Sequence, residues 1–139
     1  MVVACAPGHP FARMKTVDVG RLAGESFVAF DRGLGIRREV DRFLKRRGVA
    51  VRVTMEFDNI EAIKKAVEIG SGLSLLPSPA LERETRAGTL AQASLKTDRF
   101  VRPLGLVRRR GRPLSDAVRL VLEELRRDAR LDDRQKKKR

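Results

Sequence analysis

Short apolar runs alternate with amphipathic stretches along most of the chain. The runs MVVACA (residues 1–6) and SFVAF (residues 26–30) predict buried strands, and the first of them leaves through the turn signal PGHP. After residue 35 the apolar positions Ile36, Val40, Phe43 and Leu44 follow helical spacing, which predicts a helix capped near Gly48. VRVTMEF (residues 51–57) alternates strictly between apolar and polar residues. It predicts a half-buried strand with Met55 in the core.

The same order of elements continues beyond residue 57. DNIEAIKKAVEIG predicts a helix that begins with a capping box from Asp58 to Glu61. GLSLLP predicts a strand that Pro77 stops, and a short helix is predicted after Ser78. GTLAQASL and RFVRPLGLV predict strands, and a last helix is predicted to start at Ser115. Strands that alternate with helices at such short separations are typical of an α/β fold with largely parallel pairing.

Composition fits one ordinary globular domain. The chain has 139 residues, 42% apolar and 35% charged, and its only cysteine excludes an internal disulfide. No apolar run approaches the ~20 residues that span a bilayer, and the amino terminus has no signal-peptide pattern. These features predict a soluble cytoplasmic protein with no membrane partner.

The formal net charge of +13 is concentrated in two places. Eight basic and three acidic residues lie between Arg126 and Arg139, and the terminal RQKKKR predicts a disordered tail. VRRRGRP holds a second cluster around Arg108 to Arg112. Both segments are candidates for phosphate contact or partner docking. The alternative is a solvated turn and a solvated tail, and the absence of interleaved aromatics or a groove-reading motif disfavours specific nucleic-acid recognition.

The candidate ligand site is the loop in FDRGLGIRREVDRFL, between a strand and a helix. Gly33 and Gly35 are expected to let the backbone approach a ligand, and the amides at the helix start favour an anion. Arg32 or Arg37 is a candidate for a bidentate grip on the same anion. The alternative is that the glycines only turn the chain and that Asp31 pairs with Arg32 or caps a backbone amide.

Other candidate chemistry is weak. Cys5 and His9 are four residues apart, but Cys5 lies within an apolar strand and no acid is placed to orient His9. Glu56 is explained by strand alternation. No catalytic residue, cofactor or metal site is predicted, because a metal site needs several converging ligands.

Four segments in this order carry a family resemblance: MVVACAPGHPFA, LAGESFVAFDRGLGIRREVDRFLKRRGV, FDNIEAIKKAVEIGSGLSLLP and RPLGLVRRRGRPLSDAVRLVLEEL. Together they resemble the effector-binding domain of LysR-type transcriptional regulators over roughly residues 1–127. The resemblance implies a periplasmic-binding-protein-like (type 2) α/β subdomain whose mixed, mainly parallel sheet is flanked by helices. It implies a regulator rather than an enzyme.

The resemblance also implies how the chain is divided. Residues 1–6 correspond to a crossing strand and residues 7–97 to the second effector-binding subdomain. Residues 98–127 correspond to the strand and helix that return to the first subdomain, and residues 128–139 form the basic tail. The DNA-binding winged helix-turn-helix and most of the first subdomain are absent from these residues, so the chain is expected to contact DNA only through a helix-turn-helix domain that it lacks.

The effector is implied to be a small metabolite or anion bound in the cleft between subdomains. A homodimer is expected, in which a helix and a strand of each copy pack side by side and antiparallel. The alternative function is that of a basic nucleic-acid-associated protein acting through its arginine cluster and tail without a ligand. The residues implied to line the effector site are Ala6, Pro7, Asp31, Arg32, Gly33, Leu34, Gly35, Ile36 and Asn59.

Overall fold

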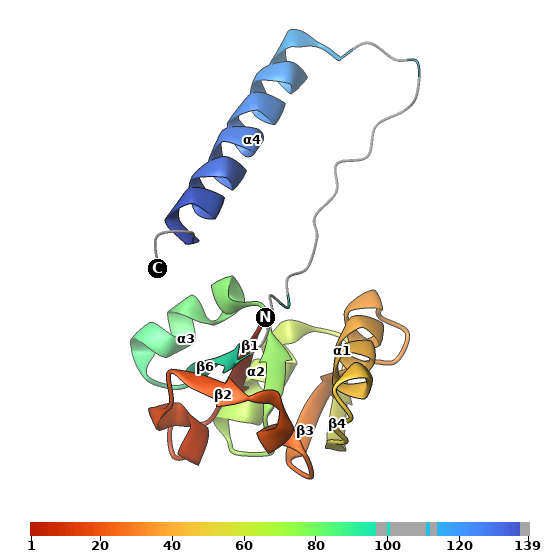
Figure 1. The fold of residues 1–139 in the computed structure, drawn as a ribbon, viewed down its shortest axis with the longest axis vertical. Coiled ribbons are helices and arrows are strands. Elements are labelled where there is room, and N and C mark those ends of the chain that lie inside the picture. The colour runs from red at the N-terminus through yellow and green to blue at the C-terminus, as the bar shows by residue number, and fades with distance from the viewer. Residues whose placement is uncertain (97–99, 101–110, 112–113, 137–139) are drawn as a thin grey trace. The chain divides into compact units, whose positions relative to one another are not determined.

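The computed structural model describes residues 1–96, 100, 111 and 114–136, of which residues 128–136 are described by their backbone alone. The chain divides into two compact units, Met1–Pro103 and Leu104–Arg139. Every described strand belongs to the first unit (Figure 1).

Four strands of the first unit form a mixed sheet with the order β2-β6-β1-β5. β1 lies in the centre and is antiparallel to both of its neighbours, whereas β2 and β6 are parallel. Every residue of β1 and β5 is buried, which explains why both strands read as continuous apolar runs in the sequence. The strands are β1 (Val2–Cys5), β2 (Thr16–Asp18), β5 (Ser74–Leu76) and β6 (Ala91–Lys96).

Among the described residues, one bridge joins the parallel pair β3 (Ser26–Phe30) and β4 (Arg52–Phe57) to this sheet. Phe27 and Leu73 form a parallel bridge, in which the N–H of Leu73 donates to Ser26 O and the N–H of Val28 donates to Leu73 O, both at 2.8 Å. The bridge gives β5 the same direction as β3 and β4.

Helices cover both faces and enclose two apolar clusters. α1 buries Val40, Phe43 and Leu44 against one face, and α2 buries Ile63 and Val67 against the other. Figure 1 shows α1 beside β3 and β4. The helices of this unit are α1 (Gly35–Arg46), α2 (Ile60–Glu68), α3 (Glu82–Ala87) and the short 3-10 helices Pro10–Arg13, Val19–Leu22 and Ser78–Leu81.

The second unit contains α4 (Asp116–Lys136). Ser115 Oγ accepts a hydrogen bond from Val118 N–H, which confirms the predicted start of the helix. The helix continues through residues 128–136, where the sequence predicts a disordered tail. No glycine or proline interrupts residues 116–136, and Arg, Leu, Lys and Gln are good helix formers, so nothing in the local sequence ends the helix earlier. No helix among the described residues is long and apolar enough to cross a membrane.

The predicted strands MVVACA, SFVAF, GLSLLP and GTLAQASL are confirmed as β1, β3, β5 and β6. The short strand β2 was not predicted, because its three residues include a single apolar side chain and so show no periodicity. The predicted strand RFVRPLGLV lies, apart from Phe100, outside the described residues. Phe100 stacks on Phe43 with ring centroids 4.2 Å apart.

The predicted strand VRVTMEF is confirmed as β4, but the side-chain pattern predicted for it is wrong in two respects. The register of the parallel pair shifts so that Phe27 and Val28 face Val53 and Met55, which leaves Thr54 in a bulge. The bulge interrupts the strict alternation of side chains. Met55 is also 40% exposed rather than in the core, because β4 is the edge strand of its sheet.

Replacing Gly72 tests the junction between the two sheets. Its φ is +153°, and a Cβ built there would lie 2.5 Å from Ser26 O, an atom that cannot move without breaking the bond to Leu73. We expect Gly72→Ala to lower the free energy of unfolding by about 1–3 kcal/mol in urea denaturation. Gly8→Ala is the control, since a Cβ on Gly8 has no atom within 4 Å. Equal stability of the two variants would contradict this account of the junction.

Candidate functional site

The carboxyl ends of β3, β4 and β5 meet at one edge of the first unit, because these strands are parallel. The loop Asp31–Leu34 follows β3, Asp58 and Asn59 follow β4, and Pro77 follows β5. In open α/β folds this edge is where ligands bind, since loops and helix starts converge there. We call it the carboxyl edge.

Hydrogen bonds within the loop hold it in a defined shape. The N–H of Gly33 donates to Asp31 Oδ1 at 2.7 Å, and the N–H of Leu34 donates to Asp31 O at 3.1 Å. Arg38 Nη1 closes the loop from α1 by donating to Gly33 O at 3.1 Å. One part of the alternative interpretation of the loop, in which Asp31 caps a backbone amide, is therefore confirmed.

Neither loop glycine is required by an unusual backbone conformation. Neither Gly33 nor Gly35 has a positive φ. A Cβ on Gly33 would lie 3.1 Å from Asp31 Oδ1, so the tight turn favours glycine there. A Cβ on Gly35 would have only the end of Arg38 nearby, at 3.8 Å, and the space before the helix is otherwise open.

The amino terminus of α1 has no side-chain cap. Leu34 occupies the N-cap position and, having no polar side chain, accepts no hydrogen bond from the amides of the first turn. The first amides of a helix lack partners within the helix, and the helix dipole makes them an attractive site for an anion. The helix start that faces the carboxyl edge can therefore accept an anionic group.

A network of ionic side chains connects the loop to α1 and β4. Arg37 is only 7% exposed; its Nη1 donates to Phe30 O at 2.7 Å and to Glu56 Oε1 at 2.9 Å. Its Nε donates to both carboxylate oxygens of Asp41 at 2.9 Å. Arg32 Nε donates to the same Glu56 Oε1 at 3.2 Å, from a side chain that is 80% exposed.

The bulge at Thr54 places Glu56 within reach of Arg37. Glu56 pairs in register with Ala29, whose side chain belongs to the apolar cluster under α1. Met55 pairs with Val28, which belongs to the cluster under α2. Glu56 was not identified from the sequence, where strand alternation accounts for it. The only available signal was the charge complementarity between an acid ending one strand and arginines following another.

The sequence-predicted site residues do not all come together. Loop residues 31–36 and Asn59 lie at the carboxyl edge, with Asn59 Oδ1 capping α2 by accepting from Ala62 N–H at 2.8 Å. The N-cap is thus Asn59, not Asp58 as predicted. Arg37 is not an open anion-binding group, because its guanidinium is buried and already paired.

Ala6 and Pro7 lie at the opposite edge from the loop. β1 is antiparallel to β5, so the carboxyl end of β1 is level with Ser74, at the start of β5. Since β5 and β3 run in the same direction, this end is also level with the start of β3. The prediction that Ala6 and Pro7 form the floor of the same site is therefore wrong. Largely parallel pairing is expected from the sequence, whereas β1 is antiparallel to both of its neighbours.

Cys5 and His9 do not form a nucleophile–base pair. Cys5 is buried, and burial raises the pKa of its thiol to about 11. His9 Nδ1 accepts a hydrogen bond from Phe11 N–H at 3.1 Å and caps a 3-10 helix. Within the described part of the chain no group of three or more His, Cys, Asp or Glu side chains is placed to bind a metal ion. The arginine cluster at residues 108–112 falls outside the described residues, apart from Gly111.

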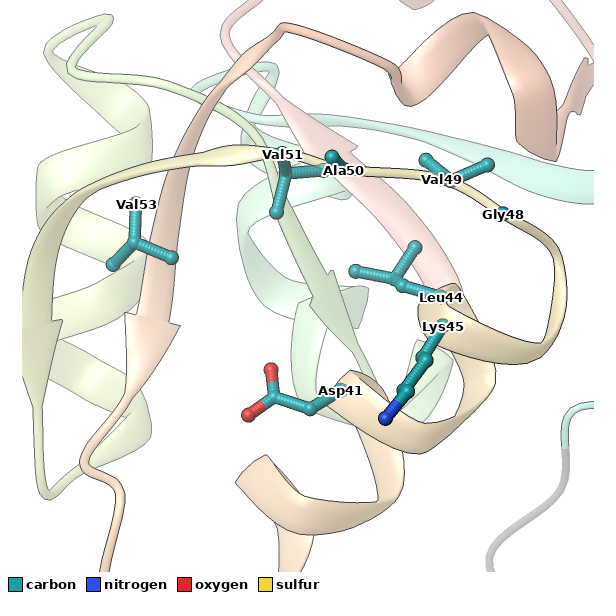
Figure 2. A pocket seen from close by; sticks show the side chains of 8 residues that line it. All are labelled: Asp41, Leu44, Lys45, Gly48, Val49, Ala50, Val51 and Val53. Carbon is teal, nitrogen blue, oxygen red and sulfur yellow. The ribbon is translucent and has the colours of Figure 1, made fainter.

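A second surface feature is an open groove of about 450 Å³ between α1 and β4 (Figure 2). Its lining is mainly apolar, and Val53 at its end is 37% exposed. Figure 2 shows Asp41 and Lys45 projecting from α1 beside this groove. The lining residues are Asp41, Leu44, Lys45, Gly48, Val49, Ala50, Val51 and Val53.

The strand order, the helices on both faces and the loop at the carboxyl edge define one lobe of an α/β ligand-binding protein. The sequence model of the protein family described as the LysR substrate binding domain matches residues 1–130. The chain belongs to this family, and its fold is the periplasmic-binding-protein-like α/β fold of LysR regulatory domains.

Relatives and solved structures agree with this assignment. The RuBisCO operon transcriptional regulator of Allochromatium vinosum is 36% identical over 118 residues, which are 85% of this chain and 39% of the relative. The HTH-type transcriptional regulator YeiE of Escherichia coli K12 is 36% identical over 123 residues, 88% of this chain and 42% of the relative. The chain thus spans about two fifths of the length of these relatives.

The regulatory domain of CcmR from Synechocystis PCC6803, solved in complex with 2-PG, superposes with a TM-score of 0.73 at 29% identity. The match covers 89% of this chain and 60% of that chain.

Acid titration tests the network around Glu56. The hydrogen bond from Arg37 holds the pKa of Glu56 below its ordinary value of 4.5. Because the pKa is lower in the folded state, the carboxylate stabilises the fold above that value, and this stability is lost as pH falls through the folded pKa. We expect Glu56→Gln to be less stable than wild type at about pH 7, and we expect this difference to shrink as pH falls below 4.5, by urea denaturation. A difference that persists in acid would contradict this.

Proposed function

We propose that this chain senses a small anionic metabolite at the carboxyl edge, as the effector-binding lobe of a LysR-type regulator. The observation that carries the proposal is the uncapped start of α1, which adjoins a shaped loop and the exposed Arg32. The start of α1 and the side chain of Arg32 both offer positively charged hydrogen-bond donors to a phosphate or carboxylate. The regulatory domain of CcmR, which is 29% identical to this chain, is solved in complex with 2-PG.

The proposed site consists of loop residues and a neighbouring helix cap. The N–H groups at the start of α1 bind the anionic group, and Arg32 approaches it from the side. Leu34 and Ile36 are partly buried against the apolar cluster under α2, so they support the loop from within. Asn59 lies at the rim, where its side chain already caps α2. The members are Asp31, Arg32, Gly33, Leu34, Gly35, Ile36 and Asn59.

The division of the chain is part of the same proposal. Residues 1–6 and 98–127 connect to a first subdomain, residues 7–97 form the second, and the effector lies between the two. DNA is recognised by a helix-turn-helix domain outside the matched region. The family match favours this function over nucleic-acid binding through the arginine cluster, because it accounts for residues 1–130 rather than for two basic segments.

The groove between α1 and β4 is the proposed homodimer surface. Within the described residues no strand pairs with the outer edge of β4, and Val53 exposes apolar surface there. Asp41 and Lys45 lie one helical turn apart beside the groove. A two-fold axis that sets two α1 helices antiparallel therefore brings Asp41 of one copy near Lys45 of the other.

Titration with 2-PG tests effector binding. We expect the backbone amide signals of residues 33–36 to shift in ¹⁵N NMR spectra, while those of Ala6 and Gly8 at the opposite edge do not. Gly35→Glu places a negative charge at the helix start, where it suits the helix dipole but repels an anion, and should weaken binding about tenfold or more. Gly8→Glu is the control with the same change of net charge. Shifts centred on residues 6–8 would refute the assignment of the site.

Sedimentation velocity tests the dimer surface. We expect the wild-type chain to form a dimer and Val53→Asp to sediment as a folded monomer, because a buried carboxylate at the interface is costly. Ile69→Asp is the matched control: Ile69 is 79% exposed at the end of α2, away from the groove, and should leave the dimer intact. A Val53→Asp variant that still dimerises would exclude this surface.

A further inference from the structure

Glu56 Oε1 accepts hydrogen bonds from two arginines, Arg32 and Arg37, which differ in burial and in the number of their partners. Arg37 is almost fully enclosed and is held by three acceptor groups, namely Phe30 O, Asp41 and Glu56. Arg32 is mostly exposed and its one described partner is Glu56, through a single hydrogen bond of 3.2 Å. Arg37 is therefore a fixed part of the fold, whereas Arg32 is held by a weak surface ion pair.

We propose that Arg32 is the residue that selects an anionic effector, and that Glu56 is its resting partner in the ligand-free state. On binding, Arg32 leaves Glu56 and donates to the anion. This inference rests on the proposed function, and it adds the residue that determines specificity and the group that competes with the effector for it.

The cost of releasing Arg32 is small because Glu56 keeps a counter-ion. A buried or half-buried carboxylate left without a partner is strongly unfavourable. Here Arg37 still donates to Glu56 at 2.9 Å after Arg32 has moved, and Asp41 still balances the charge of Arg37. The exchange therefore breaks one exposed ion pair and leaves the pairing beneath the loop unchanged.

The arrangement also predicts discrimination by charge. A neutral ligand gives Arg32 nothing in return for the bond to Glu56, so the ion pair remains and Arg32 contributes no affinity. An anionic ligand gives Arg32 a new acceptor whose negative charge equals or exceeds that of the Glu56 carboxylate it leaves. An exposed exchangeable arginine therefore favours anions, even though the uncapped helix start accepts any hydrogen-bond acceptor.

Two variants of the 139-residue chain test the proposal in NMR titrations with 2-PG and, separately, inorganic phosphate. Arg32→Gln removes the selecting charge at an exposed position and should weaken binding about tenfold. Glu56→Gln keeps an oxygen that accepts from Arg37 but removes the charge that competes for Arg32. It should therefore strengthen binding about threefold to tenfold.

The controls are Arg42→Gln and Glu39→Gln, which make the same charge changes in an exposed pair on α1. The effect specific to Arg32 or Glu56 is the change in affinity that exceeds the change in the matched control. Circular dichroism establishes that each variant is folded. If Glu56 only supported the shape of the loop, Glu56→Gln would weaken binding rather than strengthen it.

The possible outcomes separate the two proposals. Loop signals that shift equally in wild type, Arg32→Gln and Glu56→Gln overturn the role of Arg32 and leave the effector site in place. The absence of any loop shift with either anion in the wild-type chain overturns the proposed function itself. Should Glu56→Gln fail to fold, Arg32→Gln alone decides the matter, because its exposed side chain contributes little to stability.

Discussion

The two backbone hydrogen bonds between β3 and Leu73 are the constraint on which the rest of the structure depends. They are the only strand-type pairing, among the described residues, between the β3–β4 pair and the four-stranded sheet. These bonds require the main chain at Gly72 to pass directly against Ser26. Any side chain at position 72 would collide with the carbonyl oxygen of Ser26. Because this bridge is parallel, β3, β4 and β5 end at one edge, and the loop and Asn59 lie together there.

Much of the fold follows from local sequence rules. Fully buried strands produced uninterrupted apolar runs, and α1 and α2 produced the helical spacing that identified them. The loop was located because the glycines, an acid and an arginine follow a buried strand and precede a helix. Its capping by Asp31 is a local interaction between neighbours in sequence, and such interactions are readable without a structure.

What the sequence analysis missed depends on pairing between distant segments. The bulge at Thr54 is a property of the β3–β4 register and leaves no mark in VRVTMEF, so Glu56 was assigned to the wrong face. The burial of Arg37 depends on Phe30, Asp41 and Glu56 converging from three elements. Ala6 and Pro7 were misplaced because strand direction in a mixed sheet cannot be derived from the strands themselves.

The enclosed network beneath the loop has a consequence for how a lobe of this kind transmits a signal. A ligand shifts a conformational equilibrium only by its differential affinity for the two states. The N–H of Asp31 donates to Phe57 O of β4, and Arg38 of α1 donates to Gly33 O. The loop backbone therefore has little freedom to yield around a ligand. The free energy of ligand binding at such an edge would then change the position of the domain that closes over the loop, not the shape of the loop. Under the proposed function, a stiff loop with one exchangeable side chain would convert ligand charge into lobe closure rather than into local rearrangement.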